Sequence, residues 1–380
     1  MMPRNHNLSA QQRRGLRRFT NLANATPGCV KLTIGEPDFD TPQPIKDAAA
    51  AAMAAGQTHY APNQGLESLR RAVAAFENRR GMAVSPGQVL ITSGATGALY
   101  TALTGVLNPG DEVIVPTPAF TLYESIILAA GAVPVRLDIS KSDFQIRRED
   151  LAPLVSEKTR AILLNSPHNP TGVVLTQASL DAVKAVLQGK KIWILCDNVY
   201  QQLSDKPCPD LSLDGELREQ IFVCQSFSKP YAMTGWRVGY LIGPEKIMER
   251  LLLLHASMVA SVPTYLQEAC VTALDCDTSA MAAVYRRRRH FVCRRLEEMG
   301  LNYPEPEGAF YIFADISPFG MDSETFCTRL IREAGVAAVP GTCFGTEGFI
   351  RLSCACADDM LETGLDRLEI FLKRCKEESI

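Results

Sequence analysis

The sequence lacks the long apolar segments and the strong net charge that would point to a membrane or a nucleic acid. No run approaches the roughly 20 apolar residues of a membrane span, and no secretory signal opens the chain. The net charge of -3 gives no general attraction to nucleic acid or to an anionic membrane surface. We therefore expect a cytoplasmic protein that holds any anionic ligand with locally placed groups.

The sequence also lacks the spacing of a metal site. Its 12 cysteines include no Cys-x-x-Cys pair, and no histidine flanks the closest pair, Cys354 and Cys356. Most cysteines lie in apolar runs, as Cys196 does, which is typical of reduced and buried thiols. We expect no bound metal.

Internal repeats, low-complexity tracts and Gly/Ser-rich linkers are absent as well. Instead, short and mostly apolar runs alternate with helical segments through the middle of the chain. These runs are residues 89–92, 112–115, 133–137, 160–165, 190–196, 220–227 and 238–242. Strands buried on both faces of a mostly parallel sheet have this composition. The alternation predicts an α/β fold in which helices sandwich a mostly parallel sheet of seven strands.

The two ends of the chain have a different character. Short strands at 309–313 and 349–353 mix with helices and predict a smaller α+β second domain. The run of arginines at 286–289 is interpreted as the solvated face of a helix. Near the amino terminus, Leu16, Phe19 and Leu22 have helical spacing and predict an amphipathic arm that packs on the body, although the arginine-rich composition also suits a mitochondrial presequence.

Small and polar residues follow five of the predicted strands. They are residues 93–97, 116–120, 165–172, 197–200 and 226–229. In an open sheet of this class, ligands bind outside the carboxyl ends of the strands. We therefore expect these clusters to meet in one crevice, although each could separately be explained as turn chemistry.

One cluster has the chemistry to hold an aldehyde cofactor with a phosphate. Lys229 follows Ser226 and Ser228, and Arg237 lies eight residues further on. The lysine can form a Schiff base while the hydroxyls and Arg237 hold the phosphate. The alternative is a loop with a solvated lysine.

A second cluster could complete the phosphate site. Ser93, Gly94, Ala95 and Thr96 lie where a strand turns into a helix, so backbone N–H groups and the helix dipole can meet an anion. A tight turn without a ligand would use the same residue types.

Three further residues need an explanation for their surroundings. Asp197 directly follows a buried strand and needs a partner for its charge, unless it caps a helix. Arg351 is a single cation in an apolar strand, suited to a carboxylate or to a structural ion pair. Phe120 lies in a proline-bounded turn, where it is either a core aromatic or a stacking surface.

Together these motifs carry a resemblance that covers most of the chain. It extends over residues 32–42, 59–63, 165–172, 226–229, 308–313 and Arg351. The sequence resembles class I, fold-type-I aminotransferases that depend on pyridoxal 5'-phosphate, in the branch that holds many aspartate and aromatic aminotransferases. The resemblance implies an arm with part of the small domain at 1–45, a large cofactor-binding domain at 46–280 and a small domain at 281–380.

The resemblance also implies residue roles at the cofactor. Lys229 is the Schiff-base lysine and proton shuttle, and Asp197 pairs with the ring nitrogen. Tyr200 and Asn169 bind the 3-oxygen, and Phe120 stacks on the ring.

At the substrate, the resemblance implies that Arg351, Asn169 and Gly35 bind the α-carboxylate. It further implies that Tyr60 reaches the phosphate in a neighbouring subunit, which makes the active enzyme a homodimer.

Substrate choice depends on two positions where relatives carry a cation for a side-chain carboxylate. Here they are matched by Thr96 and Ser257. We therefore predict an aromatic or broad-range L-amino acid as donor and 2-oxoglutarate as acceptor, with Arg17 and Arg18 as candidate mobile cations for the acceptor. The alternatives are an aspartate aminotransferase and, because the same carbanion can expel a leaving group, a C–S β-lyase. A cofactor-sensing regulator is disfavoured, since only about 30 residues precede the Gly35 motif.

Overall fold

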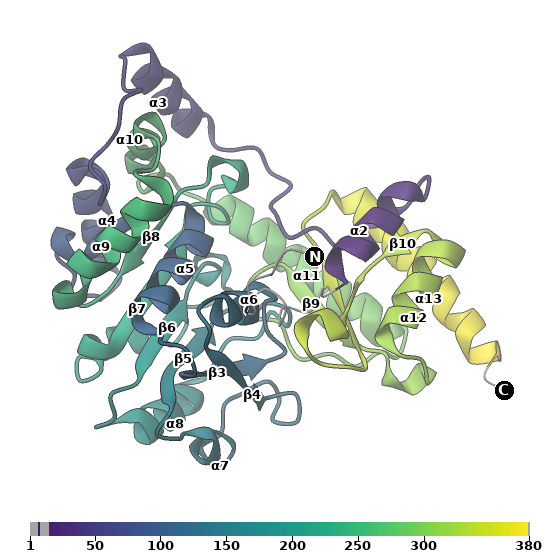
Figure 1. The fold of residues 1–380 in the computed structure, drawn as a ribbon. Coiled ribbons are helices and arrows are strands. Elements are labelled where there is room, and N and C mark those ends of the chain that lie inside the picture. The colour runs from purple at the N-terminus through teal and green to yellow at the C-terminus, as the bar shows by residue number, and fades with distance from the viewer. Residues whose placement is uncertain (1–6, 8–14, 379–380) are drawn as a thin grey trace, which may run out of the picture.

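A computed structural model describes residue 7 and residues 15–378 of the chain. Within these ranges the strands form one large sheet and two small ones. Figure 1 shows the large sheet with its helices in one body and the small sheets with the carboxyl-terminal helices in a second body. The predicted α/β class with a smaller α+β part is confirmed.

The large sheet contains all seven predicted strands, in the order β2-β8-β7-β6-β5-β3-β4. Their bounds are β2 Val89–Thr92, β3 Glu112–Thr117, β4 Val133–Asp138, β5 Thr159–Asn165, β6 Trp193–Asp197, β7 Ile221–Ser226 and β8 Gly239–Ile242. Strand β8 is antiparallel to both of its neighbours, whereas the other strands pair in parallel. The carboxyl ends of β5, β6 and β7 therefore lie at the same edge, with Asn165 opposite Asp197 and Asp197 opposite Cys224.

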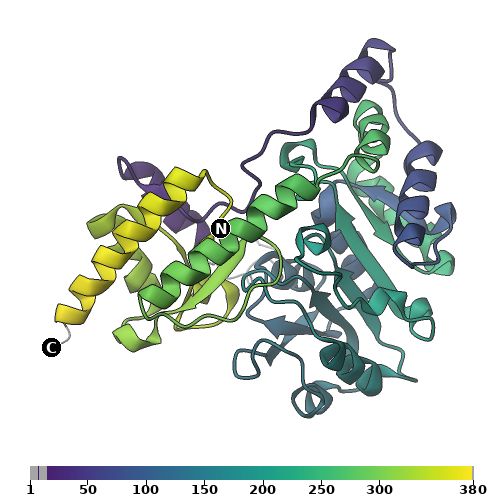
Figure 2. The same ribbon diagram turned by 180° about the vertical axis from the view of Figure 1, so that it is seen from behind.

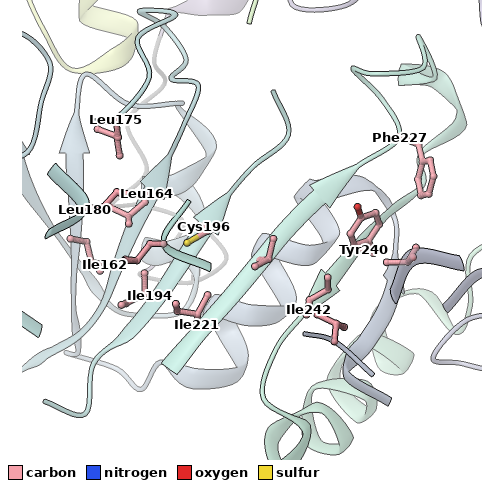
Figure 3. Packing of buried hydrophobic residues seen from close by; sticks show 14 of the residues in the cluster. Ile162, Leu164, Leu175, Leu180, Ile194, Cys196, Ile221, Phe227, Tyr240 and Ile242 are labelled. Atoms are coloured by element: carbon pink, nitrogen blue, oxygen red, sulfur yellow. The ribbon is translucent and has the colours of Figure 1, made fainter. Parts of the chain in front are cut away.

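Two hydrophobic clusters cover the two faces of this sheet, because side chains alternate along a strand. On β6, Ile194 and Cys196 belong to one cluster and Leu195 to the other. Figure 3 shows the first cluster, in which Ile162, Ile194 and Ile221 lie across three neighbouring strands. Burying each such side chain contributes about 1.5–3 kcal/mol.

Strand β4 differs from the expected composition of a doubly buried strand. Val133 is 47% exposed, and Arg136 and Asp138 face solvent. The strand pairs only with β3 and forms the edge of the sheet. An edge strand needs apolar residues on one face only, which explains the polar positions.

Twelve helices with bounds in the described ranges surround the sheets. They are α2 Leu16–Ala25, α3 Gln43–Ala54, α4 Glu67–Arg79, α5 Gly94–Val106, α6 Leu122–Ala129, α7 Arg148–Leu151, α8 Gln177–Leu187, α9 Glu245–Val259, α10 Thr264–Ala273, α11 Ser279–Glu298, α12 Ser323–Arg329 and α13 Asp358–Glu378. In Figure 2 the green helix α11 runs between the two bodies, and the yellow α13 lies beside it.

The small sheets join distant parts of the chain. Strand β1 (Val30–Lys31) pairs in parallel with β10 (Val336–Ala337). Strands β11 (Val339–Pro340), β12 (Phe349–Ser353) and β9 (Tyr311–Asp315) form an antiparallel sheet. The two-residue strands β1, β10 and β11 were not predicted, because so short a pattern carries no periodicity.

The amino-terminal helix α2 packs on this second body, as the helical spacing predicts. Phe19 is fully buried and Leu22 packs against the same cluster. The side chains of Leu16 and Arg17 lie outside the described part of the structure. Arg18 is exposed and pairs with Glu324 at 3.0 Å.

The basic run at 286–289 is not simply a solvated face, so that interpretation is wrong for half of it. Arg286 and Arg287 are exposed, but Arg288 and Arg289 are buried. Successive residues on a helix are about 100° apart, so four of them cannot share one face. Arg289 pairs with Asp205, and Arg288 pairs with Asp38 and Asp358.

Candidate active site

A cavity of about 250 Å³ opens at the carboxyl ends of β5, β6 and β7. Twelve of the residues singled out in the sequence line it. They are Gly35, Ala95, Thr96, Phe120, Asn169, Asp197, Tyr200, Ser226, Ser228, Lys229, Arg237 and Arg351. The clusters that lie far apart along the chain therefore meet in one place, as the position of the strand ends predicts.

Asp197, the last residue of β6, is a buried carboxylate without a cation bound to it among the described residues. The Tyr123 hydroxyl donates to its Oδ2 at 2.6 Å, and the Val199 N–H lies 3.4 Å from its Oδ1. Burial raises the pKa of Asp197 to about 6, against the lowering effect of these hydrogen bonds and of Lys229. A cation placed beside Asp197 would relieve this cost.

Tyr123 is a residue that the sequence reasoning missed. It lines the cavity, and its ring meets that of Phe120 edge to face at 5.6 Å. Phe120 precedes α6 and Tyr123 is the second residue of that helix, so helical spacing does not link the two. The sequence therefore offered no periodic signal for Tyr123.

Lys229 lies three residues after the end of β7 and lines the cavity. Its Nζ donates to the carbonyl oxygen of Gly35 at 2.5 Å. Burial lowers the pKa of Lys229 to about 8, with Glu36 acting in the opposite direction and Arg237 and Arg351 adding to the decrease. A lowered pKa makes the neutral, nucleophilic amine available close to neutral pH.

The two serines beside Lys229 are arranged around a common point. Ser226 Oγ donates to Ser228 Oγ at 2.8 Å, and the backbone N–H of Ser228 donates to Ser226 Oγ at 3.0 Å. Both serines are buried. Hydroxyls can turn toward an incoming anion without any change in the backbone.

Arg237 and the first turn of α5 form the other wall of this cradle. Arg237 has a left-handed backbone (φ 54°), and a Cβ built on Gly94 would lie 2.7 Å from its guanidinium. Glycine is therefore needed at position 94 for the guanidinium to approach the helix. No side-chain cap bond occupies the described start of α5, so its N–H groups remain available for an anion.

Arg351 lies on β12, is only 5% exposed and, among the described residues, has an amide and a carbonyl rather than a carboxylate as partners. Its Nη1 donates to Asn169 Oδ1 at 3.0 Å and its Nη2 to the carbonyl oxygen of Thr33 at 3.0 Å. Its guanidinium lies 4.3 Å from the Tyr311 ring. The buried Nε has no hydrogen-bond partner. The alternative of a structural ion pair is therefore wrong.

Asparagine and tyrosine side chains complete the site. Asn165 donates to the carbonyl oxygen of Asp197 at 2.9 Å and accepts from the Asn169 N–H at 2.9 Å, which fixes the loop that carries Asn169. Tyr200 and Tyr311 share a hydrogen bond of 3.1 Å between their hydroxyls. No role was predicted for Asn165 or Tyr311.

Four predicted residues lie outside the cavity lining of this chain. Ser93 and Gly94 lie at the start of α5 beside it. Tyr60 is 91% exposed between α3 and α4. Ser257 is on α9, where its hydroxyl donates to the Leu253 carbonyl.

The described residues include no group of three potential metal ligands and no helix long and apolar enough to cross a membrane.

The chain is similar to known proteins along most of its length. The profile of a family described as aminotransferase class I and II matches residues 27–368. A probable N-acetyl-LL-diaminopimelate aminotransferase of Bacillus subtilis is 38% identical, over 96% of this chain and 94% of that protein. The aromatic-amino-acid aminotransferase 2 of Thermococcus litoralis is 38% identical, over 95% of this chain and 96% of that protein.

Among solved structures, the aspartate aminotransferase of Thermotoga maritima superposes with a TM-score of 0.92. It is 35% identical, and the match covers 97% of this chain and 100% of that one.

Proposed function

Since the chain belongs to the class I and II aminotransferase family, we propose that it uses pyridoxal 5'-phosphate to move an amino group from an L-amino acid to a 2-oxo acid. The observation that carries this proposal is the cavity in which Lys229, Asp197 and Arg351 face one another. These residues supply an amine, a buried carboxylate and an unpaired cation.

The cofactor would supply an aldehyde for the amine and a protonated ring that withdraws electrons from the substrate Cα. Asp197 would hold the proton on the ring nitrogen, and Tyr123 would hold Asp197 in place through its 2.6 Å hydrogen bond. Ser226, Ser228 and Arg237, with the start of α5, would bind the phosphate. Phe120 would cover one face of the ring, and Tyr200 and Asn169 would bind its 3-oxygen.

Lys229 would move the proton on the substrate Cα. A pKa of about 8 allows its Nζ both to accept and to release a proton near neutral pH. The Gly35 carbonyl oxygen, which accepts from Nζ, holds the amine at the cavity wall.

Arg351 would bind the α-carboxylate of the substrate. Two of its five N–H donors are used by Asn169 and Thr33, so the remaining donors can form two parallel bonds to a carboxylate. Because the guanidinium is buried against Tyr311, a neutral side chain in this position would lose both charge and orientation.

For the donor we propose an aromatic or broad-range amino acid, with 2-oxoglutarate as acceptor. Thr96 lines the cavity without bringing a charge, and Leu99 and Phe120 offer apolar surface beside it. An aspartate side chain would have to lose its hydration there without a partner. Aspartate remains the second candidate, because relatives named aspartate aminotransferases are equally similar.

We further propose a homodimer. Tyr60 is 91% exposed, and the large apolar side chains Met53, Tyr100, Leu253 and Met258 are exposed on α3, α5 and α9. Exposed apolar groups on neighbouring elements are typical of an interface.

The free thiols of all twelve cysteines support a reducing, cytoplasmic location.

The proposed domain boundaries near residues 45 and 280 have support from the core. One hydrophobic cluster combines Phe19 and Leu32 mainly with residues beyond 280, whereas Ile45 belongs to the cluster of the large sheet.

A panel of amino donors with 2-oxoglutarate tests the proposed function. We expect formation of the matching 2-oxo acids, with a higher kcat/KM for phenylalanine or tyrosine than for aspartate. A preference for aspartate would mean that the protein is an aspartate aminotransferase and not an aromatic or broad-range one. Release of ammonia and pyruvate from cysteine-type donors, without transamination, would mean that it catalyses β-elimination instead.

A further inference from the structure

Residues 33–41, here called the crossing segment, connect the two bodies of the protein between β1 and α3. Figures 1 and 2 show it as a purple coil without helix or strand. Within the described residues, no backbone-to-backbone hydrogen bond involves this segment. Side chains must therefore determine where it lies.

The crossing segment contributes directly to the cavity. The carbonyl oxygen of Thr33 accepts from Arg351 and that of Gly35 from Lys229. The Glu36 carboxylate accepts from the Thr234 hydroxyl at 2.8 Å, and Thr234 also lines the cavity. A displacement of this segment would move two acceptors away from the two cations of the site.

Asp38 holds the crossing segment to α11. Nη1 of Arg288 donates to both carboxylate oxygens of Asp38 at 2.9 Å each. The Tyr285 hydroxyl donates to Asp38 Oδ1 at 3.1 Å and accepts from the Asp38 N–H at 3.3 Å. Asp38, three positions after Gly35, is thus one fixed point of the segment, and the Thr41 hydroxyl, which donates to the Ala232 carbonyl at 2.7 Å, is another.

Arg288 is built into this contact on every side. Its side chain is 9% exposed, and its guanidinium lies 5.8 Å from the Phe39 ring and 5.9 Å from the Tyr285 ring. Its Nε donates to Asp358, the first residue of α13, at 2.6 Å. One planar guanidinium therefore connects the crossing segment, α11 and α13 through N–H groups that point in fixed and different directions.

We infer that Arg288, which does not line the cavity, is a positioning residue for the reaction: by holding Asp38 it keeps the carbonyls of Thr33 and Gly35 against Arg351 and Lys229. The inference rests on the proposed function for its kinetic part. Loss of the Arg288–Asp38 contact should weaken substrate binding, because Thr33 and Gly35 border the proposed α-carboxylate site. The phosphate-binding residues and Asp197 should keep their positions.

The test compares Arg288→Gln and Asp38→Ala with Arg287→Gln as matched control. Arg287 is the preceding residue on α11 and also pairs with Asp358, at 2.8 Å, but it does not touch Asp38. Hydrogen exchange of a peptide covering residues 33–41 reports the position of the crossing segment. Steady-state kinetics separate KM for the amino donor from kcat. The absorbance of bound cofactor shows whether the residues at the strand ends still hold it.

For Arg288→Gln and Asp38→Ala we expect faster exchange in residues 33–41 and a KM raised about tenfold, as for loss of one charge-assisted hydrogen bond. Cofactor absorbance should stay at the level of the unaltered protein. The double variant should lose no more than either single one, since both changes break the same contact. Arg287→Gln, which leaves both carboxylate partners of Arg288 in place, should have little effect.

Unchanged exchange and unchanged KM in both Asp38→Ala and Arg288→Gln would overturn the inference, as would a loss of cofactor equal to the loss of substrate affinity. If Arg288→Gln fails to fold, Asp38→Ala decides the matter, because it leaves the Arg288–Asp358 pair intact. Should the unaltered protein fail to transaminate, the proposed function falls, while the exchange experiment still tests the anchoring of the segment.

Discussion

The cavity is bordered by two regions that reach the same place by different means. Asp197 and Ser226 are the last residues of β6 and β7, where the backbone ladders fix their positions, and Lys229 follows three residues after β7. Thr33 and Gly35 lie on the crossing segment, which side chains alone hold in place within the described structure. We expect the ladders to make the first region, here called the rigid half, less mobile than the second region, here called the adjustable half.

The largest expected effect is in the rigid half. Lys229→Ala should abolish covalent cofactor binding and lower kcat by on the order of a thousandfold or more, because it removes both the nucleophile and the proton carrier. Absorbance spectra, borohydride reduction with peptide mapping, and kinetics measure this. The exposed Lys206 provides a control, since Lys206→Ala should bind the cofactor and turn over substrate as the unaltered protein does. Reductive labelling of a different lysine would contradict the assignment.

The second largest effect is expected at Arg351, which contacts Thr33 of the crossing segment. Arg351→Gln should raise KM for the amino donor by roughly 100-fold, because a buried bidentate pair with the α-carboxylate is lost. Cofactor absorbance should be retained, which distinguishes substrate binding from cofactor binding. Arg374→Gln, an exposed change on α13, is a suitable control. Equal losses of cofactor and of substrate affinity would remove the distinction between the two regions.

The electrostatic cost in the rigid half should appear in the stability of the cofactor-free protein. The folded pKa of Asp197 is raised from 3.8 to about 6 by burial, so the folded state binds the proton more tightly than the unfolded state. The contribution of Asp197 protonation to the free energy of unfolding is fully present below pH 3.8 and is lost as pH rises through about 6.

Asp197→Asn should therefore reduce the decline in unfolding free energy across that pH range, by on the order of a few kcal/mol. Urea unfolding at several pH values, with the cofactor removed, measures the difference. An identical pH dependence in both proteins would show that Asp197 carries no such cost.

The smallest expected effect concerns a residue that lies in neither region of its own chain. Tyr60→Phe should weaken cofactor retention by about 1 kcal/mol, the loss of one hydrogen bond to a charged group, if the hydroxyl reaches the phosphate of a second subunit. Dialysis followed by absorbance measures retention, and sedimentation measures assembly. A fully active monomer at assay dilution would refute the shared site.

The cofactor half could be predicted from the sequence because its residues directly follow recognisable strands. The runs before Asp197 and Lys229 are apolar and long enough to identify, and parallel strands end at a common edge. Tyr123 was missed because a tyrosine in an apolar helix is usually a core residue. Arg288 was misjudged because neighbouring arginines on a helix point in different directions.

The sequence by itself determined the α/β fold, the strand ends and the residue types of the cofactor site. These follow from local patterns, since hydrophobic periodicity selects the strands and their ends select the site. Only the tertiary structure decided that Arg351 keeps a free buried Nε and that Asp38 is held by Arg288, 250 positions later. Such contacts join residues that are far apart in the sequence and depend on how the two bodies pack together. A local pattern of residues carries no information about such pairs.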